Sequence, residues 1–492
     1  MGAYLEKLVN IREKSGNRQT EGLDDETIAG FIETDPALRE AIDRAISLLD
    51  AVPEEAKKLI SRDEGSLGEY VQRDFLNFYG SDAVTPYVPL AGAGPWIVTA
   101  HGAVVHDSGG YGMLGLGHAP DAVLDVMAKP YVMANVMTPS VSQLRLAERL
   151  KKEIGHARGS FPFDSFICMN SGSEAVAVAA RIADIGALSE TQKGARHAGF
   201  AVKSLSLVGG FHGRTTRPAQ VSHSTLPIYR KYLASFQGND LLTTVELNDV
   251  EALERTFAEA GQNGVFFDAF FVEPVMGEGQ PGRGMSRAFY DAARELTRKT
   301  GTMLVVDSIQ AALRATGCLS IVDYPGFEDC APPDMETYSK ALNAGQFPLS
   351  VLALTEEAAK VYARGVYGNT MTTNPRALEV GCAVLDSIDD EMRENVRRRG
   401  AEMLEKLEAL GAEVPGSING VEGTGLIVCA ELDPERHTVT GPGGVEERLR
   451  KRGVSMIHGG ENGLRFTPHF SINSAEIDFI VKTVGEVLRE AS

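Results

Sequence analysis

The 492-residue sequence has few cysteines, no long apolar run and no excess of basic residues. Its five cysteines are scattered without a CxxC pair, so neither a disulfide framework nor a zinc site of that type is expected. No stretch approaches the length that crosses a bilayer, and the opening residues, MGAYLEKLVNIREK, are charged where a secretory signal is apolar. These absences predict a cytoplasmic protein.

The charge balance, the spacing of the histidines and the context of one glycine motif argue against further kinds of partner. With 48 basic and 67 acidic residues, the net charge of −19 repels nucleic acid and anionic membrane surfaces. The histidines show no HExxH or similar spacing, so no metal is expected. Gly110, Gly112 and Gly115 fit GxGxxG, but they follow a strand and a turn instead of opening a helix, so a dinucleotide site is not expected either.

The pattern of apolar residues divides the chain into four segments. Residues 1–80 carry apolar residues at helical spacing and predict an N-terminal helical extension. Short runs punctuated by Gly and Pro over 81–125 predict a small β element. Over 126–380, strand-like runs such as SFICMN and TMLVVD alternate with helical stretches, which predicts an α/β domain with a mainly parallel sheet flanked by helices. Residues 381–492 are expected to join the N-terminal β element in a smaller α+β domain.

One candidate anion site lies in NSGSEAVAVAARIA. A strand is expected to stop at Asn170, turn through residues 171–173 and enter a helix. Gly172 lets the backbone approach closely, Ser173 adds a hydroxyl, and the unpaired amides at the helix start attract a phosphate. An ordinary helix capped by a serine explains the same residues at least as well.

Two further candidates are Asp307 and Lys340. Asp307 ends the apolar run TMLVVD, where a desolvated carboxylate needs a cationic partner; a protonated pyridine nitrogen and a plain strand-end cap are equally consistent. Lys340 lies between an extended segment and a turn rich in Gly and Pro, although a single lysine is usually a solvated surface charge. The two follow the phosphate-site candidate in the chain order of pyridoxal-phosphate enzymes of fold type I.

The sequence resembles the class III aminotransferases, particularly the ornithine and lysine ω-aminotransferases, over roughly residues 85–490. The resemblance rests on seven motifs in family order: NSGSEA, GGFHGRT, VEPVMGEG, VVDSIQ, YSKALNAGQFPLS, GNTMTTNP and GLRFTPHF. It implies a fold type I domain with a seven-stranded sheet and a homodimer with shared active sites. It also implies ping-pong transfer of an ω-amino group from ornithine, lysine or a related donor to 2-oxoglutarate.

The resemblance further implies pyridoxal 5′-phosphate as the cofactor. Lys340 would bind it as a Schiff base and then act as the base, and Asp307 would keep the pyridine nitrogen protonated, so both residues would be catalytic. Gln310 would hydrogen-bond the phenolic oxygen, and Phe211 would stack on the ring. The other implied cofactor contacts are His212, Glu273, the phosphate-binding pair Gly172 and Ser173, and Thr370, which would reach the neighbouring subunit's site; without the resemblance, Thr370 would be taken as a turn residue.

Substrate residues are implied in the same way. An arginine matching Arg465 pairs with a glutamate matching Glu278 while the donor is bound, and then holds the dicarboxylate acceptor. Arg214 would take the acceptor's other carboxylate, and Tyr111 and Tyr87 would orient the donor. For each arginine, an exposed salt bridge is the alternative.

The chain departs from the family in DSIQAALRATG, where the family usually has DExQTGxGRTG. Ser308 replaces the usual glutamate. The other replacements are Ala311-Ala312 for Thr-Gly, Ala315 for arginine, Met276 for glutamine and Val176-Ala177 for a polar pair. Because the pocket decides which bond breaks, a racemase, epimerase or decarboxylase is the alternative activity. A non-catalytic binding module is a third.

Overall fold

A computed structural model describes residues 2–80, 84–238 and 240–490 of the protein. The chain divides into two compact units. Unit 1 comprises Met1–Asp121, Arg398–Glu422 and Val428–Ser492, and unit 2 comprises Ala122–Arg397 and Gly423–Ile427. Within the described ranges, every helix is too short or too polar to cross a membrane.

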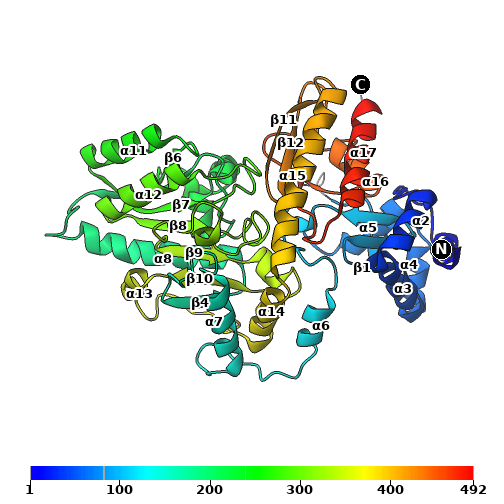
Figure 1. The fold of residues 1–492 in the computed structure, drawn as a ribbon, viewed down its shortest axis with the longest axis horizontal. Coiled ribbons are helices and arrows are strands. Elements are labelled where there is room, and N and C mark those ends of the chain that lie inside the picture. Colours follow the sequence, from blue (N-terminus) through cyan, green and yellow to red (C-terminus); the bar gives the residue numbers. More distant parts are fainter. Residues whose placement is uncertain (1, 81–83, 239, 491–492) are drawn as a thin grey trace. The chain divides into compact units, whose positions relative to one another are not determined.

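Unit 2 is built on a seven-stranded sheet in the order β4-β10-β9-β8-β7-β5-β6 (Figure 1). The strands are β4 Ser165–Met169, β5 Ala201–Leu207, β6 Leu242–Val245, β7 Val265–Val272, β8 Met303–Asp307, β9 Met335–Tyr338 and β10 Ser350–Leu354. The pairs from β9 to β6 are parallel, and β10 is antiparallel to both of its neighbours. The predicted α/β fold with a mainly parallel seven-stranded sheet is confirmed.

The central strands are apolar along their whole length because helices cover them. β7 reads VFFDAFFV and β8 reads MLVVD, continuous runs typical of parallel strands that are buried on both faces. Small side chains on α8 (Gly172–Thr191), among them Ala175, Ala179 and Ala183, pack in the same core as β7 and β8. Because β4, β5, β7, β8 and β9 run in one direction, the polar residues that follow them meet at one edge of the sheet.

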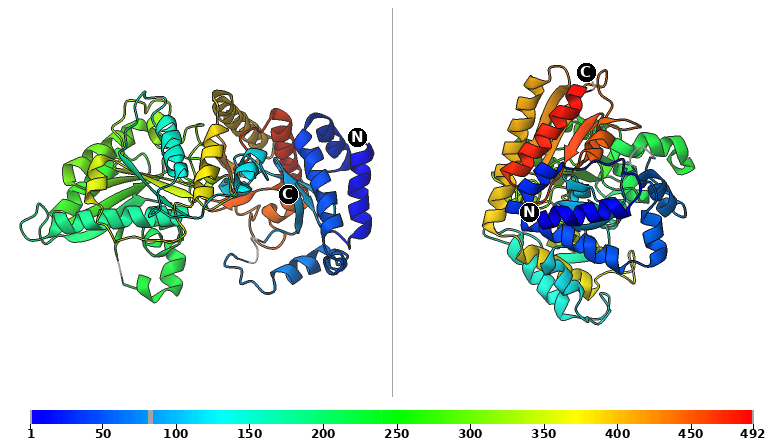
Figure 2. Two further views of the ribbon diagram at one scale, coloured as in Figure 1. Left: turned by 90° about the horizontal axis from the view of Figure 1, so that it is seen from below. Right: turned by 90° about the vertical axis from the view of Figure 1, so that its right-hand side faces the viewer.

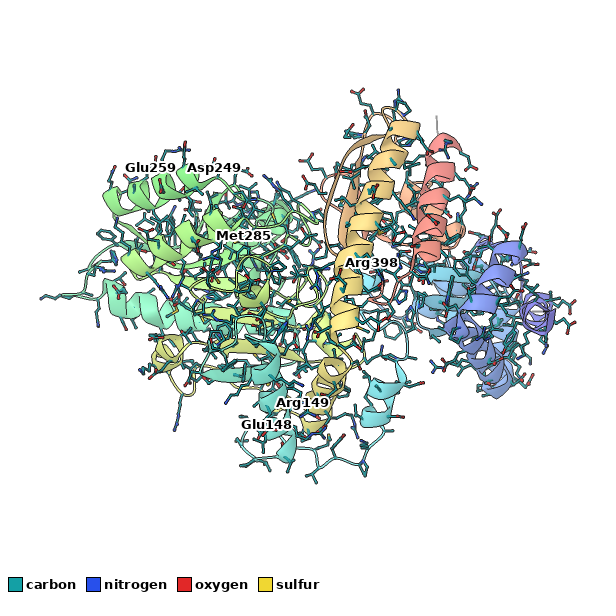
Figure 3. All side chains as sticks on the ribbon, viewed as in Figure 1. Glu148, Arg149, Asp249, Glu259, Met285 and Arg398 are labelled. Atoms are coloured by element: carbon teal, nitrogen blue, oxygen red, sulfur yellow. The ribbon has the colours of Figure 1, made fainter. Side chains whose placement is uncertain are left out.

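The remaining helices of unit 2 are α6 Asp121–Met127, α7 Val141–Glu153, α9 Thr216–Val221, α10 Leu226–Tyr232, α11 Val250–Gln262, α12 Arg287–Thr300, α13 Glu356–Val361 and α14 Pro375–Asp386. Asp249, labelled in Figure 3, caps α11 by accepting the Ala252 amide at 2.8 Å. Arg149 on α7, also labelled there, pairs with Asp386 at the end of α14 at 2.9 Å. Such local contacts set the ends and neighbours of the helices that surround the sheet.

Unit 1 contains two four-stranded sheets, in the orders β1-β2-β3-β13 and β11-β12-β15-β14. The strands are β1 Pro89–Ala93, β2 Trp96–Thr99, β3 Val104–Asp107, β11 Ile418–Thr424, β12 Ile427–Leu432, β13 Val454–Ser455, β14 Ile457–Gly459 and β15 Gly463–Phe466. The later helices are α15 Asp390–Glu413, α16 Val445–Lys451 and α17 Ser474–Glu490. The predicted β element after residue 81 corresponds to β1, β2 and β3.

The N-terminal helices share the core of unit 1. They are α1 Gly2–Lys14, α2 Asp25–Thr34, α3 Pro36–Ala51, α4 Glu54–Ile60 and α5 Glu64–Gln72, and α1, α2 and α3 lie side by side in Figure 2. Ile28, Phe31 and Ile42 share one buried cluster with Trp96 of β2. Asp35 caps α3 and also accepts the Trp96 indole N–H at 2.5 Å. Sequence periodicity detects the helices but not the sheet against which they pack.

Candidate functional site

Lys340 lies where the carboxyl ends of the parallel strands meet. It begins a short 3₁₀ helix, Lys340–Asn343, that follows β9. Its φ of 41° places a non-glycine residue in the left-handed region, which costs free energy and points to a functional constraint. The half-buried Lys340 Nζ donates a hydrogen bond to Gln310 Oε1. Gln310 is itself buried, and its Nε2 has no hydrogen-bond partner among the described residues.

Asp307 ends β8 and is only 4% exposed. Its Oδ2 lies 2.8 Å from Nδ1 of the fully buried His212, and its Oδ1 accepts the Thr337 hydroxyl at 3.1 Å. On the far side of the imidazole, His212 Nε2 lies 3.2 Å from Ser206 Oγ. A carboxylate held on both oxygens in this way keeps one orientation.

The resemblance implies His212 as a cofactor contact, but the sequence does not predict its contact with Asp307. The two residues are 95 positions apart, and only the parallel order of β5, β7 and β8 brings them together. No local pattern in GGFHGRT identifies the partner of this histidine.

The candidate phosphate site lies at the start of α8, which begins at Gly172, inside the predicted turn. Ser171 caps the helix, and Glu174 completes a capping box, so the serine does act as an ordinary helix cap. The loop after β5 approaches this helix start closely: a Cβ at Gly213 would lie 2.2 Å from Ser173 Oγ. The Arg214 amide donates to Ser173 Oγ at 3.3 Å, which joins the Gly213 loop to the helix start.

Glu273 follows β7 and is 3% exposed. Its two oxygens accept the amides of Phe211 at 2.8 Å and Gly277 at 2.9 Å. Burial raises the pKa of Glu273 to about 7. With both oxygens engaged by backbone, Glu273 holds the Phe211 loop in place, and the guanidinium of Arg214 lies over the Phe211 ring at 5.4 Å from its centre.

The replaced residue Ser308 is part of a buried network below this edge. Ser308 Oγ and Ser320 Oγ each donate to Glu336 at 2.6 Å, and the Ile321 amide donates to the same carboxylate at 3.0 Å. Burial raises the pKa of Glu336 to about 7. The family usually has a glutamate at position 308. In this chain that residue is a serine, and it contacts the carboxylate of Glu336 on the neighbouring strand β9.

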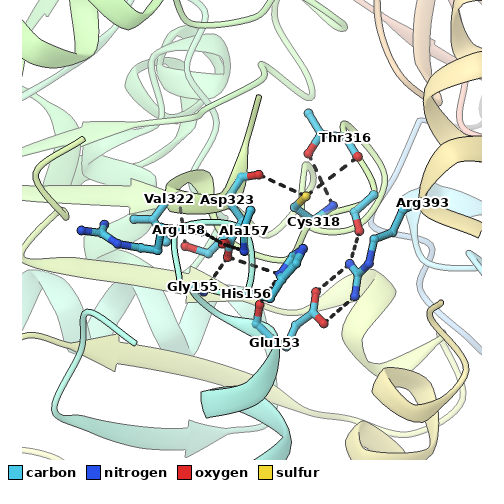
Figure 4. A network of polar contacts seen from close by, with 12 residues as sticks. Glu153, Gly155, His156, Ala157, Arg158, Thr316, Cys318, Val322, Asp323 and Arg393 are labelled. Atoms are coloured by element: carbon cyan, nitrogen blue, oxygen red, sulfur yellow. Dashed lines mark hydrogen bonds and ion pairs between the residues drawn. The ribbon is translucent and has the colours of Figure 1, made fainter. Parts of the chain in front are cut away.

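The contacts in Figure 4 hold the chain after Ser308, around Gly317 and Asp323, against neighbouring segments of unit 2. Asp323 accepts the Gly155 amide at 2.6 Å. Arg393 binds Glu153 through two hydrogen bonds of 2.8 and 2.7 Å and donates to the Gly317 carbonyl at 2.6 Å. Loops that bind cofactors need such support, because their own backbone makes few ladder hydrogen bonds.

The predicted substrate residues fall in both units. In unit 2, Arg214 is exposed and Glu278 is half-buried. In unit 1, Tyr87 and Tyr111 line one pocket, and Arg465 is buried on β15 next to Cys429 of β12. Thr370 is exposed on the segment between α13 and α14, where its carbonyl accepts Asn135 Nδ2 at 3.4 Å.

Unit 1 also contains a buried histidine cluster that no spacing in the sequence indicates. Nε2 of His106 and Nε2 of His469 lie 2.9 and 2.6 Å from Glu476 Oε2. In the described part of the chain, these three residues are the group that has the composition to hold a metal ion. The separations are those of direct hydrogen bonds, and His106 Nδ1 contacts Ser108 Oγ at 2.9 Å.

A mainly parallel seven-stranded sheet with an aspartate ending one strand and a lysine following the next defines a pyridoxal-phosphate enzyme of fold type I. The model of the class-III aminotransferase family matches residues 79–488, and the chain belongs to that family. Class III aminotransferases use pyridoxal phosphate, and the residues here fit it. Among the described residues, the buried Gln310 Nε2 beside Lys340 has no hydrogen-bond partner, so it can donate to an acceptor of the cofactor, and the oriented Asp307 suits a cationic nitrogen.

Curated relatives agree with this assignment, and a solved structure agrees with the fold. An acetylornithine aminotransferase from Neisseria meningitidis serogroup A is 30% identical over 419 residues, which cover 83% of this chain and 96% of that protein. One from Xanthomonas axonopodis pv. citri is 30% identical over 378 residues, with 75% and 85% covered. The crystal structure of the ornithine aminotransferase from Toxoplasma gondii superposes with a TM-score of 0.74 at 22% identity, covering 89% and 98% of the two chains.

Proposed function

We propose that this aminotransferase takes the terminal amino group of ornithine, lysine or a related donor and passes it to 2-oxoglutarate in a ping-pong reaction. One observation carries the proposal: the Lys340–Gln310 contact and the Asp307–His212 pair meet at the same edge of the sheet. The acetylornithine and ornithine aminotransferases that the chain resembles support the donor class.

Pyridoxal phosphate, when bound, supplies an electron sink for the carbon that loses its proton. Lys340 would hold the cofactor covalently and, once released, would move the proton between the donor carbon and the cofactor. Asp307 would keep the pyridine nitrogen protonated, with His212 as its positioning residue. Gln310 Nε2 would donate to the phenolic oxygen.

The remaining cofactor contacts follow from the loops around this centre. Phe211 would cover one face of the ring, on a loop that Glu273 holds through its amide. Gly172 and Ser173 would bind the phosphate at the positive end of α8. Arg214 and Arg465 are proposed for the two carboxylates of the acceptor on the strength of the resemblance, because a guanidinium pairs with a carboxylate through two parallel hydrogen bonds. Glu278 would pair with Arg465 while the donor is bound.

We propose a homodimer in which Thr370 reaches the partner's cofactor phosphate. Support comes from an exposed apolar patch on unit 2 near Thr370, the kind of surface that marks protein–protein contacts. It consists of Val132, Met133, Val136, Met137, Val141, Leu144 and Met371, each at least 51% exposed. The Asn135–Thr370 contact joins the two loops that carry most of these side chains.

The donor half-reaction tests the proposed function. Purified holoenzyme mixed with L-ornithine or L-lysine alone should convert to the pyridoxamine form, seen as loss of the absorbance of the aldehyde form, and 2-oxoglutarate should restore it. If no terminal-amine donor produces this change, the proposed activity is wrong. Exchange of the α-hydrogen in deuterated water or release of carbon dioxide, without pyridoxamine formation, would instead establish the racemase or decarboxylase alternative.

A further inference from the structure

One buried carboxyl group in unit 2 closes the loop that follows β8. Glu336 on β9 is fully buried, and its Oε1 accepts the Ser308 hydroxyl at 2.6 Å and the Ile321 amide at 3.0 Å. Its Oε2 accepts the Ser320 hydroxyl at 2.6 Å. Ser308 begins the loop 308–320 and Ser320 ends it, so a single side chain holds both ends of the loop.

This loop carries Gln310, whose side chain contacts Lys340. The Ala312 amide donates to the Ser308 carbonyl at 2.8 Å, so Gln310 lies inside a turn that starts at Ser308. The Gln310 side chain is also closely packed, because a Cβ at Gly277 would overlap its Cγ. A displacement of Ser308 would therefore move Gln310 away from its present position.

Glu336 lies on the strand that leads to Lys340, so it also ties the loop to that strand. Successive residues of a strand point to opposite faces of the sheet. The Thr337 hydroxyl donates to Asp307 on one face, and Glu336 accepts from Ser308 on the other. Asp307 thus has its own partner on β9, and the effect of Glu336 falls on the residues that follow Asp307.

Burying this carboxyl group costs free energy. Burial raises the pKa of Glu336 to about 7, although the hydrogen bonds from Ser308 and Ser320 favour its charged form. An apolar side chain would fill the same place on β9 without that cost. Buried polar groups whose partners are all in place make the surrounding structure rigid, and strongly shifted carboxyl groups gather at functional sites.

We propose that Glu336 is a positioning residue of the cofactor site, which holds Gln310 where its amide can donate to the cofactor's phenolic oxygen. The inference rests on the role that the proposed function gives to Gln310. Glu336 acts through the loop that it closes and not by contact with the cofactor. Removing its carboxyl group should therefore weaken cofactor binding only as far as it displaces Gln310.

A double-mutant cycle on cofactor affinity tests this role. Gln310→Ala should weaken binding of pyridoxal phosphate to the apoprotein about five- to tenfold, as expected for one hydrogen bond. Glu336→Leu should weaken it about three- to tenfold by itself, but less than about twofold when residue 310 is already alanine. Glu336→Gln keeps an oxygen for Ser308 and Ile321 and should restore most of the affinity.

Hydrogen exchange of the apoprotein gives a second measurement that needs no cofactor. Peptides that cover 308–321 should exchange faster in Glu336→Leu than in the wild type or in Glu336→Gln. Ser308→Ala and Ser320→Ala each remove one end of the connection and should give intermediate rates. If Glu336→Leu does not fold, Ser308→Ala takes its place in the cycle.

Asp268→Leu is the matched control, because it removes another buried carboxyl group from the same sheet. Asp268 on β7 accepts the Ser204 hydroxyl at 2.7 Å and pairs with Arg217 at 3.2 Å. The variant should lower the thermal midpoint but leave cofactor affinity and the exchange of 308–321 unchanged. Glu336→Leu should change all three.

Additive losses of affinity in the cycle, or losses of the same size in Asp268→Leu and Glu336→Leu, would overturn the inference. An unchanged affinity in Gln310→Ala would also overturn it, because Gln310 would then have no role for Glu336 to support. The donor half-reaction tests the aminotransferase proposal separately, so that proposal can stand when this inference fails. Failure of every terminal-amine donor in the half-reaction would instead count against the proposed function and not against the position of Gln310.

Discussion

At the scale of single residues, the orientation of Asp307 depends on its neighbours as much as on its own position. His212 and Thr337 each hold one of its oxygens, and Ser206 in turn contacts His212. Groups that orient a charged ligand of this kind typically change activity by 10- to 100-fold when they are removed.

His212→Gln should therefore lower the rate of the donor half-reaction roughly 10- to 100-fold and weaken retention of pyridoxal phosphate on dialysis. Gln has no rigid ring, so it cannot make both the short contact to Asp307 and the contact to Ser206 in one fixed orientation. Ser206→Ala removes only the longer 3.2 Å contact and should have a clearly smaller effect. Stopped-flow absorbance and cofactor titration measure both quantities. Equal effects of the two variants would contradict the role of His212 as the positioning residue of Asp307.

The raised pKa of Glu336 predicts the direction in which the stability of the protein changes with pH. Burial raises its pKa to about 7 from an ordinary value of 4.5, so between pH 4.5 and 7 the folded state keeps a proton that the unfolded chain has lost. Stability contributed by this group is thus present below pH 4.5 and is lost as the pH rises towards 7. Glu336→Gln should reduce that loss by up to about 1.4 kcal/mol per pH unit.

Denaturant unfolding of the wild type and Glu336→Gln at pH 5 and pH 8 measures this difference. Glu357→Gln on the exposed side of α13 is the control and should follow the wild type at both values. A steeper loss of stability with rising pH in Glu336→Gln would show that the carboxylate is ionised in the folded protein at low pH.

At the scale of secondary-structure elements, α3 shows why the N-terminal helices belong to unit 1. One face of the helix, with Leu38 and Ile42 fully buried, packs in the same cluster as Trp96, while Leu48 on the same helix is 46% exposed. The apolar period of the sequence identifies that buried face, but it does not say which partner covers it.

Ile42→Ala should destabilise the protein by about 2–5 kcal/mol, because it removes methylene groups from a filled core and leaves a cavity. Leu48→Ala in the same helix should cost less than about 1 kcal/mol, because that side chain already contacts water. Denaturant or thermal unfolding of the two variants measures the contrast. Comparable losses would mean that the extension does not pack as described.

The elements that could be predicted are those whose sequence pattern is local. The apolar run that ends at Asp307 predicts β8, and the extended segment before Lys340 predicts β9. The run SVLAL predicts a strand at β10 but carries no direction, and the structure makes it antiparallel.

At the scale of the whole molecule, contacts between distant segments escaped prediction because no local pattern encodes them. The Asp307–His212 pair and the carboxylate of Glu336 beside Ser308 each depend on the order of strands in the sheet. The roles of Arg465, Glu278 and Thr370 rest on the family resemblance and remain proposals.

The proposed sharing of active sites between two subunits gives the last prediction. Lys340→Ala inactivates its own subunit's site, whereas Thr370→Glu would place a carboxylate against the phosphate of the partner's site. Each variant alone should be nearly inactive. If the two are unfolded and refolded together in equal amounts, half of the dimers are hybrids, and in each hybrid one site has an intact Lys340 and an intact partner threonine. Activity should return to about a quarter of the wild-type value, since one site in four is complete.

Thr370→Ser, which keeps the hydroxyl, should remain active by itself and serves as the conservative control. Size-exclusion chromatography confirms that the refolded variants form the same assembly as the wild type. Activity of the mixture that stays at the sum of the separate variants, with dimers present, would show that Thr370 does not serve the neighbouring subunit. The exposed apolar patch around Val136 and Met371 would then need another explanation, because a second copy of the chain is the partner that Thr370 requires.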